Sequence, residues 1–161
     1  MIVPSTATPN WVEPAAASLD RKVCNTVNVC CIERSAVDRM LPVVVQAVAA
    51  AAAERKATGI IHGDDELRTL IAQSAAADHI RTEPLPEAGL CHEFEWENDP
   101  ELSIVLVDSI EHAVKLCNEH SPHFVVSVLT DEPELVERVY ASADAPFVGN
   151  GFTRWVDGQY A

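Results

Sequence analysis

Short apolar runs that alternate with helix-like stretches are the feature that most constrains the fold of this chain. Runs of apolar and β-branched residues predict strands at 27–32, 59–62, 102–107, 124–129 and 146–148, and an alternating run predicts an edge strand at 93–97. Helical composition and start signals predict helices at 15–21, 36–56, 64–77, 109–118 and 132–142. Strands and helices in this order form right-handed βαβ units. The sequence therefore predicts an α/β fold with a mostly parallel sheet covered by helices.

The length of 161 residues suits one domain with a real core and is too short for separate cofactor and substrate domains. Residues 1–18 carry Pro4, Pro9 and Pro14 among polar residues and show no hydrophobic period at their start. We expect a flexible N-terminal lead-in over 1–18 and an α/β domain over 19–161.

The charge balance bears on possible partners. Lys and Arg number 11 and Asp and Glu number 25, so the formal net charge is −14. Because binding to phosphate backbones and anionic headgroups depends on clustered cations, nucleic acid and membrane surfaces are disfavoured as partners. No apolar run approaches the ~20 residues of a membrane span, and no basic stretch followed by an apolar one resembles a secretion signal. We therefore expect a cytoplasmic location.

The cysteines fit free thiols better than a disulfide framework, because their number is odd and their spacing is irregular. They are Cys24, Cys30, Cys31, Cys91 and Cys117.

Cys24 is the candidate nucleophile. It follows Arg21 and Lys22, at a turn between a predicted helix and a predicted strand. Nearby cations and free backbone N–H groups favour the thiolate form of cysteine. The alternative is an ordinary buried residue, since cysteine often packs as a small hydrophobe.

The glycine-rich segment 149–158 follows the last predicted strand. Loops at the carboxyl ends of strands in open α/β sheets commonly bind ligands. Asn150 and Thr153 offer hydrogen bonds, and the guanidinium of Arg154 suits a carboxylate or a phosphate. An ordinary turn with a surface ion pair remains the alternative.

Cys117, His120 and His123 lie three residues apart, which superficially resembles a metal-binding set. Pro122 breaks any helix there, and no fourth ligand has a recognisable spacing, so we predict no metal. A histidine-rich helix C-terminus is the simpler interpretation. The sequence also lacks the glycine patterns that cradle nucleotide phosphates.

Two separated segments together resemble one family. Residues 20–26 (DRKVCNT) resemble the segment around the catalytic cysteine of γ-glutamyl phosphate reductase, also called glutamate-5-semialdehyde dehydrogenase, in the aldehyde dehydrogenase superfamily. Residues 150–158 (NGFTRWVDG) resemble the NASTRFTDG segment of the same family. Residues 107–109, 118–120 and 129–131 follow in the expected order between them.

The resemblance implies the fold of an aldehyde dehydrogenase-like catalytic domain and an oxidoreductase of proline biosynthesis. It implies that the Cys24 thiolate attacks an acyl phosphate or an aldehyde, and that the resulting thioester and hemithioacetal are interconverted by hydride transfer with NADP. Asn25 would line the pocket, and Asn150, Thr153 and Arg154 would contact substrate. In the family, the nucleotide-binding domain flanks this region, so the resemblance implies a catalytic portion that lacks that domain and does not transfer hydride alone.

Two residues depart from the family pattern. Asn28 stands where the family commonly has Glu, and Phe152 stands where it has Ser. We expect Phe152 to reshape the pocket, which leaves open an aldehyde other than the glutamyl one. A further hypothesis is a non-catalytic acidic interaction domain that kept the fold and pairs with a partner or with itself, as a homo-oligomer.

Overall fold

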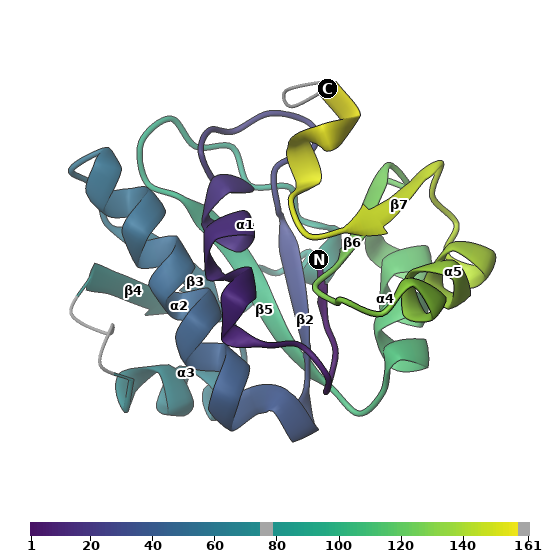
Figure 1. Cartoon of the computed structure of the whole chain (residues 1–161). Coiled ribbons are helices and arrows are strands. Elements are labelled where there is room, and N and C mark those ends of the chain that lie inside the picture. The colour runs from purple at the N-terminus through teal and green to yellow at the C-terminus, as the bar shows by residue number, and fades with distance from the viewer. Residues whose placement is uncertain (75–78, 158–161) are drawn as a thin grey trace.

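The strands of this chain form one parallel sheet. In residues 1–74 and 79–157, which a computed structural model describes, seven strands pair in the order β4-β3-β5-β2-β1-β6-β7, and every pairing is parallel (Figure 1). The strands are β1 (Ile2–Val3), β2 (Val29–Glu33), β3 (Gly59–His62), β4 (Ile80–Glu83), β5 (Glu101–Val107), β6 (Val125–Val128) and β7 (Phe147–Asn150). Their carboxyl ends therefore lie at one edge of the sheet and their amino ends at the other. The predicted α/β fold with a mostly parallel sheet is confirmed.

Helices cover both faces of this sheet. The α-helices are α1 (Val12–Ala17), α2 (Val37–Glu54), α3 (Asp65–Ala72), α4 (Ile110–His120) and α5 (Pro133–Ser142). The first three share a core with one face, and α4 and α5 share a second core with the other. Short 3₁₀ turns lie at Pro9–Trp11, Arg34–Ala36, Gly89–Cys91 and Thr153–Asp157.

Side-chain alternation in β2 separates the two cores. Cys30 and Ile32 pack against the face that carries α2, whereas Cys31 packs against the face that carries α4. This follows from the two-residue period of a strand. The adjacent cysteines therefore lie in different environments.

The expectation of a flexible lead-in over residues 1–18 is wrong. Ile2 and Val3 form β1 between β2 and β6, and neither side chain is exposed. The Met1 nitrogen donates to the Val29 carbonyl oxygen at 2.8 Å. Two residues are too few to show a hydrophobic period. Pro9 and Pro14 fit the first turns of the helical segments that follow, because proline lacks only an N–H that is unpaired there.

The predicted edge strand over 93–97 is also wrong. These residues form a loop. Apolar and charged residues alternate in it because Phe94 and Trp96 are buried while the glutamates beside them are exposed. The edge strand is β4, which pairs with β3 and lacks a clear apolar pattern.

The other predicted elements lie close to their expected positions. The strand at 59–62 matches β3, and Ser109 caps α4 by accepting a hydrogen bond from the His112 N–H. The predicted helix at 15–21 instead lies at 12–17, and the predicted helix at 64–77 ends at 72, with residues 75–77 outside the described ones.

One helical segment, 34–54, is long and apolar enough to cross a membrane by length and composition. This segment is the core helix α2 with its preceding turn, and 61% of its most apolar 18-residue stretch is buried inside the molecule. A buried core helix passes the same test, so this is weak support for a membrane span.

Candidate active site

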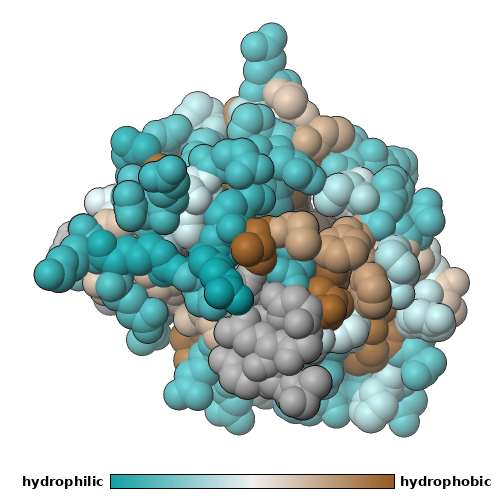
Figure 2. Space-filling view, turned by 90° about the horizontal axis from the view of Figure 1, so that it is seen from above, coloured by the Kyte–Doolittle hydropathy of each residue, from teal (hydrophilic) through white to brown (hydrophobic). Residues whose placement is uncertain are grey.

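A cavity of about 380 Å³ lies where β1, β2 and β6 begin. Its walls come from the loop before β2, the loop after β4, the end of α4 and the turn after β7. Its lining includes Lys22, Cys24, Asn25, Cys31, Leu90, Cys91, Glu93, Cys117, Glu119, His120 and Thr153. Figure 2 views the molecule from this side and shows apolar residues gathered in the middle of a mainly hydrophilic face.

Cys24 is exposed and lies in a turn closed by Thr26. The Thr26 hydroxyl donates to the Arg21 carbonyl oxygen at 2.6 Å and accepts from the Val23 N–H at 2.9 Å. The Thr26 N–H also donates to the Val23 carbonyl oxygen at 3.0 Å. These bonds fix the backbone on both sides of Cys24, so its thiol is presented to the cavity by a defined turn. Asn25, the next residue, is buried and also lines the cavity.

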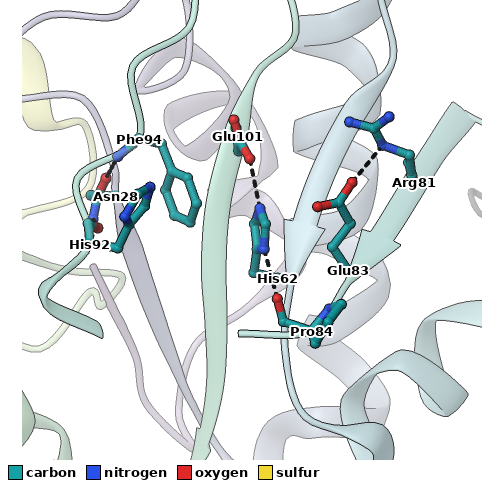
Figure 3. A network of polar contacts seen from close by, with 8 residues as sticks. All are labelled: Asn28, His62, Arg81, Glu83, Pro84, His92, Phe94 and Glu101. Atoms are coloured by element: carbon teal, nitrogen blue, oxygen red, sulfur yellow. Dashed lines mark hydrogen bonds and ion pairs between the residues drawn. The ribbon is translucent and has the colours of Figure 1, made fainter. Parts of the chain in front are cut away.

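Asn28 holds the loop that forms the opposite wall. Its amide nitrogen donates to the His92 carbonyl oxygen at 2.7 Å, and its amide oxygen accepts from the Phe94 N–H at 3.0 Å (Figure 3). A glutamate at this position would lack the donor. Asparagine at position 28 therefore supplies both bonds that hold this loop, which a glutamate could not do.

The same loop is supported by a stacked aromatic contact. Phe94 packs against His62 with ring centroids 4.6 Å apart and an interplanar angle of 21°. The His62 ring contacts Glu101 Oε1 at 2.7 Å and the Pro84 carbonyl oxygen at 2.9 Å (Figure 3). Leu90, which lines the cavity, thus belongs to a loop that is held from two sides.

Thr153 reaches the cavity from the far end of the chain. Its N–H donates to the hydroxyl of the buried Ser18 at 3.0 Å, and that hydroxyl donates to the Pro14 carbonyl oxygen at 2.8 Å. Within the described residues, the buried Thr153 hydroxyl has no hydrogen-bond partner. A buried polar group without a partner is costly, so this hydroxyl is suited to contact a ligand.

The segment after β7 turns away from the carboxyl edge of the sheet, where the sequence predicts ligand binding. Gly151 has a φ of +74°, and its N–H donates to the Val128 carbonyl oxygen at 3.0 Å. A Cβ there would lie 2.5 Å from the Trp11 ring, so glycine is required for both conformation and space. This turn sends Thr153–Asp157 back toward the amino ends of the strands (Figure 1).

The remaining residues expected in the site have different outcomes. Asn150 is exposed at the end of β7, where its amide donates to the Thr130 carbonyl oxygen at 3.4 Å, and it does not line the cavity. Phe152 is half-buried and does not line it either. The side chain of Arg154 lies outside what the structure describes. The geometry therefore brings together Cys24, Asn25 and Thr153.

Sequence reasoning missed that other thiols share this cavity. Cys91 Sγ lies 3.4 Å from His120 Nδ1, and Cys117 packs against the core cluster that contains Cys31. The neighbouring Cys31 thiol, acting as a hydrogen-bond donor, lowers the pKa of Cys117 to about 6, against the opposing effect of burial. The odd cysteine count gave no signal of this convergence, because the residues come from three separate elements.

The histidine and cysteine set considered for a metal divides between two places. Cys117 and His120 line the cavity, whereas His123 Nδ1 lies 3.0 Å from the Asp144 carbonyl oxygen. Within residues 1–74 and 79–157, no group of three or more His, Cys, Asp or Glu side chains is arranged to hold a metal ion.

The electrostatics of the cavity disfavour large anions. Helix α4 ends at His120, so its partial negative charge lies at the cavity. Glu93 and Glu119 add carboxylates, and Lys22 is the one Lys or Arg among the lining residues that the structure describes. A dinucleotide pyrophosphate usually binds the opposite, positive end of a helix. The described residues therefore do not fit a nicotinamide dinucleotide.

The solved structures that this fold resembles are aldehyde dehydrogenases and related reductases. The γ-glutamyl phosphate reductase of Thermotoga maritima superposes with a TM-score of 0.76 and 19% identity, over 98% of this chain and 35% of that one. The NADP-dependent glyceraldehyde-3-phosphate dehydrogenase of Bacillus halodurans superposes with a TM-score of 0.57 and 13% identity, over 94% of this chain and 37% of that one. The chain thus has an aldehyde dehydrogenase-like fold.

Within that class, the sequence resembles γ-glutamyl phosphate reductase, as its two motif segments predict. The enzyme of Salmonella arizonae is 29% identical over 136 residues, which cover 84% of this chain and 29% of the relative. The enzyme of Trichormus variabilis is 29% identical over 152 residues, which cover 89% of this chain and 30% of the relative. No model of a known protein family matches the sequence. The chain spans under a third of the length of these curated relatives.

Proposed function

We propose that this chain is the thiol-bearing catalytic portion of an oxidoreductase related to γ-glutamyl phosphate reductase, with Cys24 as nucleophile. The observation that carries the proposal is the convergence of Cys24, Asn25 and Thr153 on one cavity, although Cys24 and Thr153 lie far apart in the sequence. Both belong to the segments that resemble the family. A cytoplasmic location and a role in proline biosynthesis are part of the same proposal.

The proposed chemistry of this chain is confined to the thiol. The Cys24 thiolate adds to an aldehyde carbon to give a hemithioacetal, or displaces phosphate from an acyl phosphate to give a thioester. The Thr153 hydroxyl is suited to donate to the developing oxyanion. NADP, which the resemblance implies, supplies hydride in such enzymes, but no hydride step is assigned to residues of this chain.

An aldehyde that carries no phosphate is a second candidate substrate. The negative end of α4 and the carboxylates of Glu93 and Glu119 oppose a phosphate in the cavity, whereas Leu90 and the cysteines suit an apolar body. Such a substrate would make the protein a dehydrogenase for an aldehyde other than the glutamyl one.

Acyl transfer to Cys24 tests the nucleophile without any cofactor. The full chain is incubated with acetyl phosphate, and its intact mass and modified peptide are measured. We expect one acetyl group on Cys24 that neutral hydroxylamine removes. Cys24→Ser should abolish it, and Cys91→Ser, which removes another exposed thiol of the cavity, should retain it.

The aldehyde arm of the experiment separates the two substrate classes. A simple aliphatic aldehyde should slow alkylation of Cys24 by limiting iodoacetamide, because a hemithioacetal hides the thiol. Protection by aldehyde without acetylation would assign the second candidate. If the folded chain shows neither effect at Cys24, or if Cys24 is alkylated no faster than the buried Cys30, Cys24 is not the nucleophile.

The non-catalytic interaction domain is the other candidate. Phe147 in the edge strand β7 and Trp155 in the turn that follows it are 37% and 38% exposed, with ring centroids 6.1 Å apart. Tyr140 on α5 is 60% exposed. Exposed apolar patches promote association. Light scattering would favour the interaction domain if it shows a homo-oligomer that Trp155→Ser converts to monomer. Cys24 should then be neither acetylated by acetyl phosphate nor protected by the aldehyde.

A further inference from the structure

Cys31 and Cys117 come from different elements and meet at one wall of the cavity. Cys31 lies in β2 with its side chain on the face covered by α4, and Cys117 lies near the end of α4. Cys117 packs against the core cluster that contains Cys31, both residues line the cavity, and each thiol shifts the pKa of the other. Cys31 is 1% exposed whereas Cys117 is partly exposed, so Cys117 is the thiol that a small solute in the cavity reaches first.

The pair is chemically asymmetric. The Cys31 S–H donates to Cys117, which lowers the pKa of Cys117 to about 6 and, with burial, raises the pKa of Cys31 well above its usual value. Cys117 is therefore the more acidic thiol of the pair, and Cys31 is the thiol that stays protonated beside it. A thiolate with a neighbouring second thiol is the arrangement that two-step thiol oxidation requires.

The other cysteines are placed differently. Cys30 packs in the opposite core, where burial raises its pKa to about 11. Cys91 contacts His120 rather than another thiol, and Cys24 lies in the turn closed by Thr26.

We propose that Cys31 and Cys117 are a modification site for hydroperoxides, at which the two thiols close to a disulfide that joins β2 to α4. The Cys117 thiolate attacks the distal peroxide oxygen, so that an S–O bond forms, the O–O bond breaks and the alcohol leaves with a proton from solvent. The Cys31 sulfur then attacks the Cys117 sulfenic acid, the S–S bond forms and the hydroxyl leaves as water with the Cys31 proton. Two thiols are oxidised by two electrons, and one hydroperoxide is reduced to an alcohol and water.

The disulfide would change the cavity directly. It removes a thiol and a thiolate from one wall and ties the end of α4, which carries His120, to the strand beside it. The proposal does not depend on the function proposed for Cys24.

Peptide mapping after peroxide treatment tests the proposal. The reduced full chain is treated with equimolar hydrogen peroxide, remaining thiols are blocked with N-ethylmaleimide, and unreduced peptides are analysed by mass spectrometry. We expect the Cys31–Cys117 linked peptide as the main product, a loss of two titratable thiols and full reversal by dithiothreitol.

Matched variants separate this pair from its neighbours. Cys30→Ser should leave the linked peptide unchanged, whereas Cys31→Ser should abolish it and leave Cys117 as a sulfenic acid that dimedone traps. If Cys31→Ser does not fold, Cys117→Ala should leave Cys31 unoxidised. Cys24→Ser should form the disulfide as fast as the natural sequence, so failure of the nucleophile proposal is separable from failure here.

The proposal is overturned if Cys31 and Cys117 stay reduced while Cys24 or Cys91 is oxidised. It is equally overturned if Cys117 pairs mainly with Cys24 or Cys91.

Discussion

At the scale of single residues, Asn28 shows how one amide sets the shape of the cavity. It bonds the loop after β4 through both a donor and an acceptor, and that loop contributes Leu90 and Cys91 to the lining. Each such bond contributes on the order of 1 kcal/mol, and an unmatched carbonyl adds to the cost of losing one.

Replacing Asn28 with Asp should open this loop. Asn28→Asp keeps the acceptor for the Phe94 N–H but sets a carboxylate against the His92 carbonyl oxygen. We expect amide hydrogen exchange over residues 92–94 to quicken by about threefold to tenfold, as a loss of roughly 1 kcal/mol in local stability predicts. Hydrogen exchange followed by mass spectrometry measures it.

Asn118→Asp is the matched control, because Asn118 makes the same two kinds of bond, to Ser142 and Asp144, away from that loop. Equal acceleration of hydrogen exchange over residues 92–94 in both variants would contradict the role given to Asn28.

The alkylation rate of Cys117 should depend on pH with a midpoint near 6. The pKa of Cys117 is lowered to about 6, so the thiolate fraction rises as pH rises through that value and is nearly complete at pH 7.5. Cys31→Ala removes the hydrogen bond that lowers the pKa, and labelling at pH 7 should then fall about tenfold or more as the pKa returns toward its usual range. Rates measured from pH 5 to 9 give the midpoint. A midpoint above 8 in the natural sequence would contradict the hydrogen-bonded thiolate.

At the scale of elements, β1 contributes more to the fold than its two residues suggest. It bridges β2 and β6, and Ile2 and Val3 face opposite cores with no exposed surface. The Met1 residue that precedes it lines the cavity, so this strand also positions the site.

Truncating Ile2 should therefore be costly. Ile2→Ala removes a fully buried side chain and leaves a cavity, and we expect a loss of about 2–5 kcal/mol in the free energy of unfolding. Tyr140→Ala, at a side chain 60% exposed, should change it by less than about 0.5 kcal/mol. Urea titrations of both variants measure the difference. Similar small losses would show that β1 is dispensable.

At the scale of the whole molecule, the charge and the parallel sheet act together. The net charge of −14 is joined at the cavity by the negative end of α4, so phosphates are disfavoured there. The part of this cavity that the structure describes therefore does not suit a dinucleotide.

This chain by itself should therefore show no saturable binding of NADPH up to millimolar concentration. Quenching or enhancement of NADPH fluorescence on titration measures binding, and absorbance with an aldehyde and NADP measures turnover. Saturable binding or a robust rate from this chain alone would contradict the misfit between the cavity and a dinucleotide.

The sequence by itself determined the α/β class, most elements and the thiol segment, because hydrophobic period, helix start signals and a local motif are encoded within short stretches. Cys24 and its neighbour Asn25 were predicted in that way and Thr153 came with the second motif, and all three line one cavity. Residues 1–18 and β4 were misjudged, since a very short central strand and a polar edge strand carry too little local pattern.

Tertiary structure alone decided what surrounds Cys24. The pairing of Cys31 with Cys117, the hold of Asn28 on its loop and the return of Thr153 to the amino edge each join residues from distant parts of the chain. Such contacts depend on strand order and on which face each side chain takes. Strand order and side-chain face are fixed only when the whole sheet assembles and its two cores are buried. No local sequence pattern could therefore predict these contacts.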